Sequence, residues 1–282
     1  MRQATAADPI AILSGSGGLP PVVARAAAAA GHRPVVIAIE GEADPAAFGA
    51  ARVHSLRFGE IGRLFRTLAE EGCRRAVFIG GIARRPDIAA LAPDLGALKL
   101  LPRVLSLLHG GDDRLLAGVA AIFEERGIRL VSPIEIAPDL ALAEGVATRR
   151  KPTPQDMEDA EAALAAARAI GALDIGQAAV AVEGRVVALE AAEGTDGMIA
   201  RIAELRDKRR IPKAGGVLAK CMKPRQDPRL DLPTIGPATA RNIKAAGLAG
   251  IAAEAGRTLV AGRAETIGAL DAAGLFLLGV KP

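Results

Sequence analysis

Apolar runs and amphipathic stretches alternate regularly along the first half of the chain. The apolar runs are short and rich in Val, Ile, Leu and Ala, and the segments between them repeat their apolar positions at helical spacing. The runs lie at 10–13, 35–39, 53–56, 76–79 and 128–131, and the helical segments at 21–30, 61–70 and 114–126. Strands that alternate with helices build a parallel sheet. We therefore predict that residues 1–134 form a Rossmann-like α/β domain with an open, mainly parallel sheet.

The pattern changes in the second half. Residues 155–170 predict a long helix, and the runs 178–182 and 186–190 flank Glu183-Gly184, which predicts a β-hairpin. Further strands are predicted at 216–219, 251–254, 259–260 and 275–278, and further helices at 198–208, 238–246 and 264–272. Residues 155–282 are therefore predicted to form an α+β domain with a mixed sheet. Residues 135–154, rich in proline and carrying Arg149-Arg150-Lys151, have the composition of a linker.

Composition argues against nucleic acid as a partner. The chain has six Phe and neither Trp nor Tyr, so it lacks the aromatic platforms on which single-stranded bases stack. Its net charge of +4 is mild, and its arginines are spread along the chain rather than gathered in a stripe or tail. Steering of an anionic ligand fits this distribution, whereas a dedicated DNA-binding domain is not indicated.

Cysteine and histidine give no metal pattern. Cys73 and Cys221 are far apart in the sequence and are expected to be reduced thiols. His32, His54 and His109 are scattered and do not have the spacing of zinc ligands. The chain shows neither a signal peptide nor an apolar run of about 18 residues, so we expect a cytoplasmic protein that does not span the membrane.

Two strands of the first half run into paired glycines. A strand followed by a glycine turn and a helix aims free backbone N–H groups at a phosphate. Glu40 follows a strand at about the place where a dinucleotide fold carries the acid that binds ribose. Leu19 and Pro20 stand where the dinucleotide fingerprint has its last glycine, so a plain tight turn stays open as the alternative. The residues predicted to bind phosphate or nucleotide are Gly15, Ser16, Gly17, Gly18, Leu19, Gly80 and Gly81.

Residues 88–113 are expected to be mainly structural. Residues 88–108 are rich in Leu, Ile and Ala and predict one or two core helices, which would also form part of a groove for acyl chains if the ligand has them. The following Gly110-Gly111-Asp112-Asp113 predicts a helix N-terminus, where the two acids fit the cap and the helix dipole.

Residues 220–236 combine many ionisable groups with chain-breaking residues. Pro224, Pro228, Pro233 and Gly236 exclude a regular helix or a central strand and predict a stiff, shaped loop. The loop carries two carboxylates four residues apart, Asp227 and Asp231, together with Lys220, Lys223, Arg225, Gln226 and Arg229.

This combination of side chains suits phosphoryl transfer. Carboxylates hold a divalent metal or polarise a water, and cations neutralise phosphate oxygens as charge shifts. A solvated loop with internal salt bridges is the alternative, and the spacing alone leaves both interpretations open.

Several motifs, taken in order, resemble the LpxI family across nearly the whole chain. They are Gly15-Ser16-Gly17-Gly18-Leu19-Pro20, Ile79-Gly80-Gly81, Gly111-Asp112-Asp113, Asp174-Ile175-Gly176-Gln177, the segment from Glu190 to Asp196, and the segment from Lys223 to Gly236. Only the last is specific by itself, and it is the order and spacing of the set that carry the resemblance.

The resemblance implies a Mg²⁺-dependent enzyme of lipid A biosynthesis. It would hydrolyse the pyrophosphate of UDP-2,3-diacylglucosamine, a lipid-linked nucleotide sugar, to UMP and 2,3-diacylglucosamine 1-phosphate. It would work in the cytoplasm, in peripheral contact with the inner membrane of a Gram-negative bacterium, and the resemblance leaves a homodimer open.

Roles for the loop residues follow from this chemistry. Asp227 is predicted to bind the metal or activate the water, with Asp231 as its partner, and Lys223, Gln226 and Arg229 are predicted to hold the diphosphate. Further predicted substrate-binding residues are Gln177, Thr195, Asp196 and Thr234.

Two other functions remain open at this point. An NAD(P)-dependent oxidoreductase would account for the glycine turn and Glu40 but leaves the Asp227 loop without a purpose. A nonenzymatic module that senses a nucleotide sugar or a lipid would use the same pockets with purely structural carboxylates.

Overall fold

The computed structural model describes residues 8–82, 94, 100 and 112–282. The chain divides into two compact units. Unit 1 comprises the residues up to Pro138 together with Asp227–Asp231, and unit 2 comprises Asp139–Gln226 and Leu232–Pro282. Five residues of the proline-rich loop therefore belong to unit 1, although the chain on either side of them belongs to unit 2.

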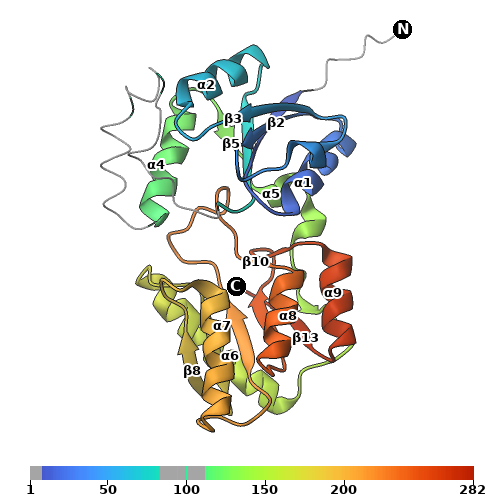
Figure 1. The fold of residues 1–282 in the computed structure, drawn as a ribbon, viewed down its shortest axis with the longest axis vertical. Helices are drawn as coiled ribbons and strands as arrows, with labels where there is room; N and C mark the ends of the chain where they lie inside the picture. The colour runs from blue at the N-terminus through green and yellow to red at the C-terminus, as the bar shows by residue number, and fades with distance from the viewer. Residues whose placement is uncertain (1–7, 83–93, 95–99, 101–111) are drawn as a thin grey trace. The chain divides into compact units, whose positions relative to one another are not determined.

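The sheet of unit 1, whose strands β2, β3 and β5 are labelled in Figure 1, is parallel and has the strand order β3-β2-β1-β4-β5. Its strands are β1 (Pro9–Ser14), β2 (Arg33–Ile39), β3 (Arg52–Leu56), β4 (Arg75–Ile79) and β5 (Arg129–Leu130). The strand order reverses between β1 and β4, and doubly wound sheets bind their ligands at such a point. The predicted Rossmann-like sheet is confirmed.

Three helices of unit 1 follow the predicted segments closely: α1 (Leu19–Ala29), α2 (Ile61–Glu70) and α4 (Asp112–Glu124). The described residues also contain the short α5 (Pro133–Ile136) and the 3₁₀ turns η1 (Pro45–Phe48) and η2 (Pro138–Leu140), which were not predicted; of η2, Pro138 alone belongs to unit 1. Apolar side chains of α2 and α4, such as Leu68 and Phe123, pack with Leu13 and Val35 of the sheet in one core. Burial of these side chains is the main force that fixes the helices on the sheet.

Unit 2 contains a six-stranded mixed sheet, with order β6-β13-β11-β9-β7-β8. Strands β9, β11 and β13 are parallel, whereas β6, β7 and β8 pair antiparallel with their neighbours. The strands are β6 (Gly145–Val146), β7 (Ala178–Val182), β8 (Arg185–Leu189), β9 (Val217–Lys220), β11 (Gly250–Glu254) and β13 (Phe276–Val280). A separate parallel pair joins β10 (Thr234–Ile235) to β12 (Leu259–Val260). The predicted mixed sheet is confirmed.

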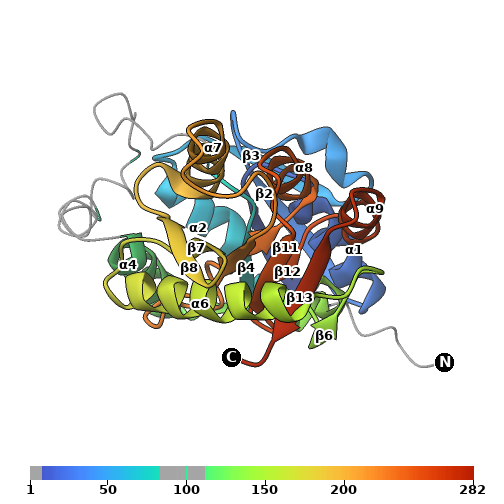
Figure 2. The ribbon, with the colours of Figure 1, turned by 90° about the horizontal axis from the view of Figure 1, so that it is seen from below.

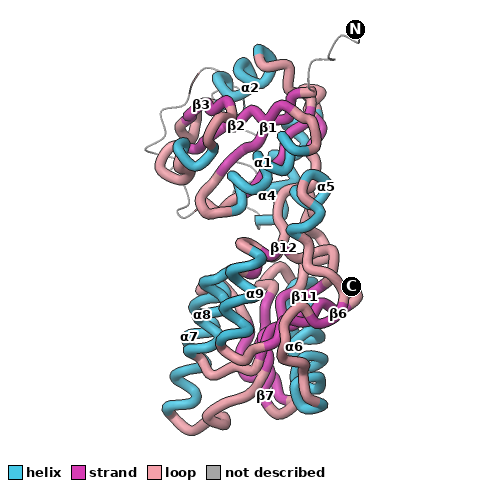
Figure 3. Tube along the Cα trace, turned by 90° about the vertical axis from the view of Figure 1, so that its right-hand side faces the viewer, coloured by secondary structure: helices cyan, strands magenta, loops and turns pink. Residues whose placement is uncertain are grey.

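Helices cover both faces of the unit 2 sheet (Figures 2 and 3). Helix α6 (Pro154–Ala172) lies on one face, and α7 (Gly194–Asp207), α8 (Pro237–Ala245) and α9 (Arg263–Ala272) lie on the other. Successive side chains of β7 pack on opposite faces of the sheet. Ala179 packs in the cluster with α6, and Val180 packs in the cluster with α7 and α8. The side chains on the face of the sheet that packs against α6 are mostly small, so this long, alanine-rich helix can lie close to the sheet.

The predicted hairpin is present in unit 2. Strands β7 and β8 pair antiparallel across Glu183-Gly184, and both turn residues have positive φ, 53° and 72°. Two positive φ values define the tight turn whose twist matches that of the flanking strands.

Some elements were not predicted. Residues 135–154 contain part of α5, η2 and β6, and Arg150 donates to the carbonyl oxygens of Ala249 and Gly274. The stretch 220–236 is irregular only in its middle, because Lys220 ends β9 and residues 234–235 form β10. The predicted helices in 88–108, the cap at Gly110-Gly111 and His109 lie outside the described residues, as do the side chains of Asp112 and Asp113.

Candidate active site

The two glycine loops of unit 1 are bonded to each other where the strand order reverses. The backbone N–H of Ser16 donates to the Gly81 oxygen at 2.7 Å, and the N–H of Gly81 donates to the Ser16 oxygen at 3.0 Å. A side chain at Gly15 would collide with the Gly81 carbonyl oxygen, and Gly80 has φ of +97° and lies against the Ser16 oxygen. These glycines are therefore required by the contact between the loops themselves.

The start of α1 has fewer free donors than a dinucleotide-binding helix. Gly17 and Gly18 are exposed, and nothing lies within 4 Å of a Cβ added at either, so a ligand can approach this backbone closely. The next residue, Leu19, is buried, and Pro20 and Pro21 have no N–H to offer. The loop fits contact with one phosphate better than the full pyrophosphate cradle of a dinucleotide fold.

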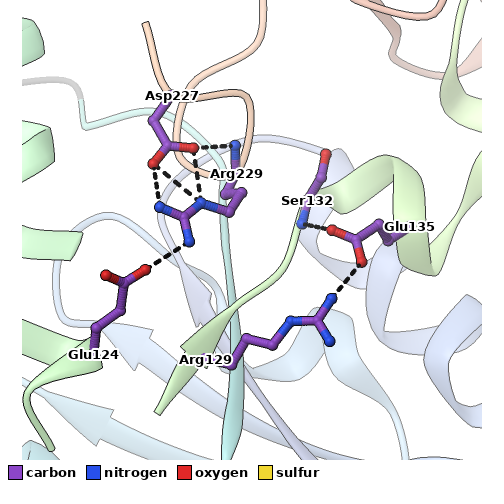
Figure 4. A network of polar contacts seen from close by, with 6 residues as sticks. All are labelled: Glu124, Arg129, Ser132, Glu135, Asp227 and Arg229. Carbon is purple, nitrogen blue, oxygen red and sulfur yellow. Dashed lines mark hydrogen bonds and ion pairs between the residues drawn. The ribbon is translucent and has the colours of Figure 1, made fainter. Parts of the chain in front are cut away.

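In unit 1, Asp227 and Arg229 form an ion pair that is held by several hydrogen bonds (Figure 4). The Nε of Arg229 lies 2.9 Å from Oδ1 and 3.1 Å from Oδ2 of Asp227, and Nη2 lies 2.6 Å from Oδ2. The backbone N–H of Arg229 also donates to Oδ1 at 2.9 Å. Both carboxylate oxygens of Asp227 are thus occupied by one residue.

Glu124, at the end of α4, holds the other side of the same guanidinium. Nη1 of Arg229 donates to Oε1 of Glu124 at 2.6 Å (Figure 4). Hydrogen bonds from Arg229 are the main cause that lowers the pKa of Asp227, and the bonds to Asp227 and Glu124 raise the pKa of Arg229. Asp227 is therefore a carboxylate and Arg229 a cation at any physiological pH.

A helical turn links Asp227 to Asp231. The N–H groups of Leu230 and Asp231 donate to the Asp227 carbonyl oxygen at 2.9 and 3.1 Å. Leu230 packs against the apolar core of unit 1, which anchors the turn. Residues four apart on a helical turn lie on the same side, so the turn presents the two predicted metal-binding carboxylates together.

Among the described residues, no group of three or more His, Cys, Asp or Glu side chains could hold a metal ion. Mg²⁺ keeps several waters and usually takes only one or two protein carboxylates. The ionised Asp227 and its neighbour Asp231 fit that requirement in number and chemistry, provided that Arg229 leaves Asp227.

A buried glutamate organises polar residues at the start of β7 and α7 in unit 2. The two oxygens of Glu190 accept from the Gln177 backbone N–H at 2.9 Å and from the Thr195 hydroxyl at 2.7 Å. The next residue, Asp196, accepts from the Asn242 side chain at 2.8 Å. The Oε1 of Gln177 is buried without a hydrogen-bond partner in the part of the chain that the structure describes. Such an atom is costly unless a ligand or water donates to it.

The lysines of the loop lie close to this group. Nζ of Lys223 lies 2.6 Å from Oδ1 of Asp174, and Nζ of Lys220 donates to the Thr234 carbonyl oxygen at 3.2 Å. The buried Gln226 accepts from the Lys223 N–H, so it shapes the loop as well as being predicted to contact substrate.

The predicted site residues therefore divide between the units. Those in unit 1 are Gly15, Ser16, Gly17, Gly18, Leu19, Gly80, Gly81, Asp227, Arg229 and Asp231, and those in unit 2 are Gln177, Thr195, Asp196, Lys223, Gln226 and Thr234. No role for Glu124 or Glu190 is predicted from the sequence. Glu190 lies in a motif that was recognised, but nothing near Glu124 in the sequence marks it.

The comparisons with known proteins agree over both units. The model of the LpxI N-terminal domain matches residues 9–140, and that of the LpxI C-terminal domain matches residues 143–278. The chain belongs to the LpxI family.

One relative extends over almost the full length of both chains. It is the UDP-2,3-diacylglucosamine pyrophosphatase LpxI of Caulobacter vibrioides, which is 43% identical over 277 residues, covering 97% of this chain and 98% of its own length. The predicted resemblance to LpxI is thus confirmed, and the candidate residues of both units lie within the matched domains.

Proposed function

We propose that the protein is an enzyme that hydrolyses the pyrophosphate bond of UDP-2,3-diacylglucosamine to UMP and 2,3-diacylglucosamine 1-phosphate. The observation that carries this proposal is the 43% identity, over 97% of the chain, to a relative named for that activity. The residues agree with it, since the ionised Asp227, a second carboxyl group at Asp231 and the guanidinium of Arg229 belong to one turn.

Arg229 exchanges partners in this mechanism. Its planar fork matches the geometry of a phosphate as well as that of a carboxylate, so the diphosphate competes with Asp227 for the same donors. Once the guanidinium of Arg229 holds phosphate oxygens, Oδ2 of Asp227 is released and Oδ1 keeps only the backbone N–H of Arg229. Glu124 keeps its bond to Nη1 and limits how far the guanidinium moves.

The released Asp227, with Asp231, would hold Mg²⁺ and orient the attacking water. The ion would supply charge neutralisation at the diphosphate and a bound water of lowered pKa. Water adds to one phosphorus, the bond to the bridging oxygen breaks, and the departing phosphate takes up the charge. Arg229 would neutralise that charge as it develops.

Unit 2 would recognise parts of the substrate with Gln177, Thr195, Asp196, Gln226 and Thr234. The buried Oε1 of Gln177 is an acceptor suited to an N–H donor, and the substrate offers such donors in its uracil ring and its acylamino group. Hydrogen bonds of this kind give strong discrimination, because the site is left with an unpaired polar atom when the donor is missing.

The two rival functions have less support. An NAD(P)-dependent oxidoreductase needs a pyrophosphate cradle, and Pro20 and Pro21 remove two of its usual donors. A nonenzymatic sensor would not require an arginine that can pass from a carboxylate to a phosphate.

We also propose that the enzyme acts in the cytoplasm in peripheral contact with the inner membrane, because its lipid substrate resides there. Among the described residues, none of the helices has the length and apolarity needed to cross a bilayer.

Incubation with UDP-2,3-diacylglucosamine and Mg²⁺ tests the proposal. We expect UMP to form, and reaction in ¹⁸O-labelled water will show which phosphorus is attacked. Reduction of NAD(P) without UMP formation would favour the oxidoreductase. Binding of the substrate without cleavage, at any concentration of Mg²⁺ or Mn²⁺, would favour the sensor.

A further inference from the structure

A hollow of about 480 Å³ opens on unit 1 between α1, the start of β2 and the η1–β3 segment. Its apolar part is formed by small side chains of α1 together with Pro34 and Phe48. Three of its lining residues are arginines, Arg25, Arg33 and Arg52, and none is acidic. Arg33 and Arg52 are the first residues of β2 and β3, so the hollow lies at the amino edge of the sheet. The glycine loops follow the carboxyl ends of β1 and β4, at the opposite edge.

A buried carboxylate beside the hollow holds two of these arginines in place. Oε2 of Glu71 lies 2.8 Å from Nη1 of Arg33, and Oε1 lies 2.7 Å from Nε of Arg52 and 3.0 Å from Nε2 of His54. Arg33 also donates to the Glu71 carbonyl oxygen. Burial opposes the charge of Glu71, but the bonds from Arg33 and His54 and the charge of Arg52 hold its pKa below the ordinary value. Glu71 is therefore a permanent anchor for both guanidiniums.

Glu71 does not neutralise all of the positive charge around the hollow. Three arginines and one carboxylate leave an excess of positive charge around the hollow. The side chain of Arg52 is 65% exposed, and it meets Glu71 through Nε. In the part of the chain that the structure describes, Arg25 has no hydrogen-bond or ion-pair partner, and Arg52 pairs with Glu71 alone. Arg25 can therefore take a phosphate without first breaking an ion pair, while Glu71 holds Arg33 and Arg52 in place in the same hollow.

We infer that this hollow is a second binding site, for a phosphate group attached to an apolar moiety. The guanidiniums would take the phosphate oxygens, and Phe48, Pro34 and the alanines would contact the apolar part. Such a ligand has two sources, an anionic phospholipid in a bilayer and a phosphate ester in solution. The site is separate from the residues proposed for hydrolysis.

Two exposed arginines allow a matched test. Arg25 on α1 lies in the hollow, and Arg66 on α2 does not; within the described residues, neither has an ion-pair partner. Arg25→Gln and Arg66→Gln therefore remove the same charge from two exposed helix positions. Equal melting temperatures would show that both variants are folded.

Binding is measured with three probes. The first probe is a phosphatidylcholine vesicle, prepared with and without phosphatidylglycerol, whose binding is measured by co-sedimentation. The second and third are dihexanoyl phosphatidic acid and inorganic phosphate, whose binding is measured by calorimetry. We expect the chain to bind the phosphate-bearing amphiphile more tightly than inorganic phosphate. Arg25→Gln should weaken this binding about fivefold, the effect of one arginine near a charged surface, and Arg66→Gln should not. Comparison of binding to the vesicles with binding to the short-chain lipid shows whether the site prefers a phospholipid in a bilayer or a phosphate ester in solution.

Three results would overturn the inference. The first is that neither amphiphile binds. The second is an equal loss in the two variants, which would indicate diffuse attraction by the whole basic surface. The third is that inorganic phosphate binds as tightly as the amphiphiles, which would remove the role of the apolar residues. None of these results bears on the hydrolysis of the nucleotide sugar.

Discussion

The Nε of Arg229 lies within 3.1 Å of both carboxylate oxygens of Asp227, while Nη1 of the same guanidinium lies 2.6 Å from Glu124. From the sequence, Asp227 is predicted to bind the metal and Arg229 to bind the diphosphate, as separate roles. The structure pairs the two side chains, so in the proposed mechanism Asp227 would become available when the guanidinium of Arg229 turns to the diphosphate.

Replacing Arg229 with lysine should lower turnover by about tenfold or more, although the positive charge is kept. Lysine is a point donor and cannot bond two Asp227 oxygens and Glu124 at once. Steady-state rates of UMP release measure the effect. Arg225→Lys is the matched control in the same loop, since Arg225 is exposed and has no ion pair within the described residues. Equal rates for the two variants would contradict the role of the fork.

The stabilisation that Asp227 contributes should decrease as the pH falls. Its pKa in the folded protein is lowered from the ordinary 3.8, mainly by hydrogen bonds from Arg229. The unfolded state therefore binds the proton more readily, so the stabilisation is fully present above pH 3.8 and is lost as pH falls through the lower folded pKa. Urea unfolding of wild type and Asp227→Asn should show a constant difference from pH 7 to about pH 4 and a shrinking one below. A difference that grows on acidification would contradict the assigned pair.

Gly15→Ala should destabilise the protein by about 2 kcal/mol or more, because the new methyl group meets the Gly81 carbonyl oxygen. Gly18→Ala is the control in the same loop. Gly18 has φ of −85° and nothing within 4 Å of an added Cβ, so its free energy of unfolding should change by less than about 0.5 kcal/mol. Thermal or urea unfolding distinguishes the two, and similar losses in both would show that the loops are not packed as described.

Glu190→Gln should raise the KM for the nucleotide sugar about tenfold while kcat changes by less than about threefold. In the amide only one of the two terminal atoms is an acceptor, so either the Gln177 N–H or the Thr195 hydroxyl, both of which donate to Glu190, loses its acceptor. Glu193→Gln changes a more exposed glutamate of the same segment and should leave both constants near wild type. A fall in kcat at unchanged KM would argue against a role in substrate binding.

Most elements could be predicted from the sequence, because their apolar runs have the period of a strand or a helix and end at Gly or Pro. Helix α2 and strands β7 and β12 have the predicted bounds, and the other predicted elements within the described residues differ by a few residues at their ends. The unpredicted strands β6 and β10 have two residues each, too few for any period, and each exists only through its partner strand.

The site was less predictable than the fold. The loop with Asp227, Asp231 and Arg229 stood out because acids and cations alternate with prolines. The role of Glu124 was not predictable, since it is 105 residues from Arg229 in the sequence and only the fold brings them together. The packing role of Gly15 and Gly80 was also missed, because a glycine that admits a ligand and a glycine that admits another loop have the same sequence pattern.

The most direct test is a single-turnover experiment with Asp227→Ala, using excess enzyme, UDP-2,3-diacylglucosamine and Mg²⁺. Asp207→Ala, at the exposed end of α7, serves as the control for loss of a carboxylate. We expect Asp227→Ala to remain folded and to bind the nucleotide sugar, while the rate of UMP formation falls by about 10³-fold or more. UMP formation at a rate close to that of wild type would contradict the claim that Asp227 takes part in the hydrolysis.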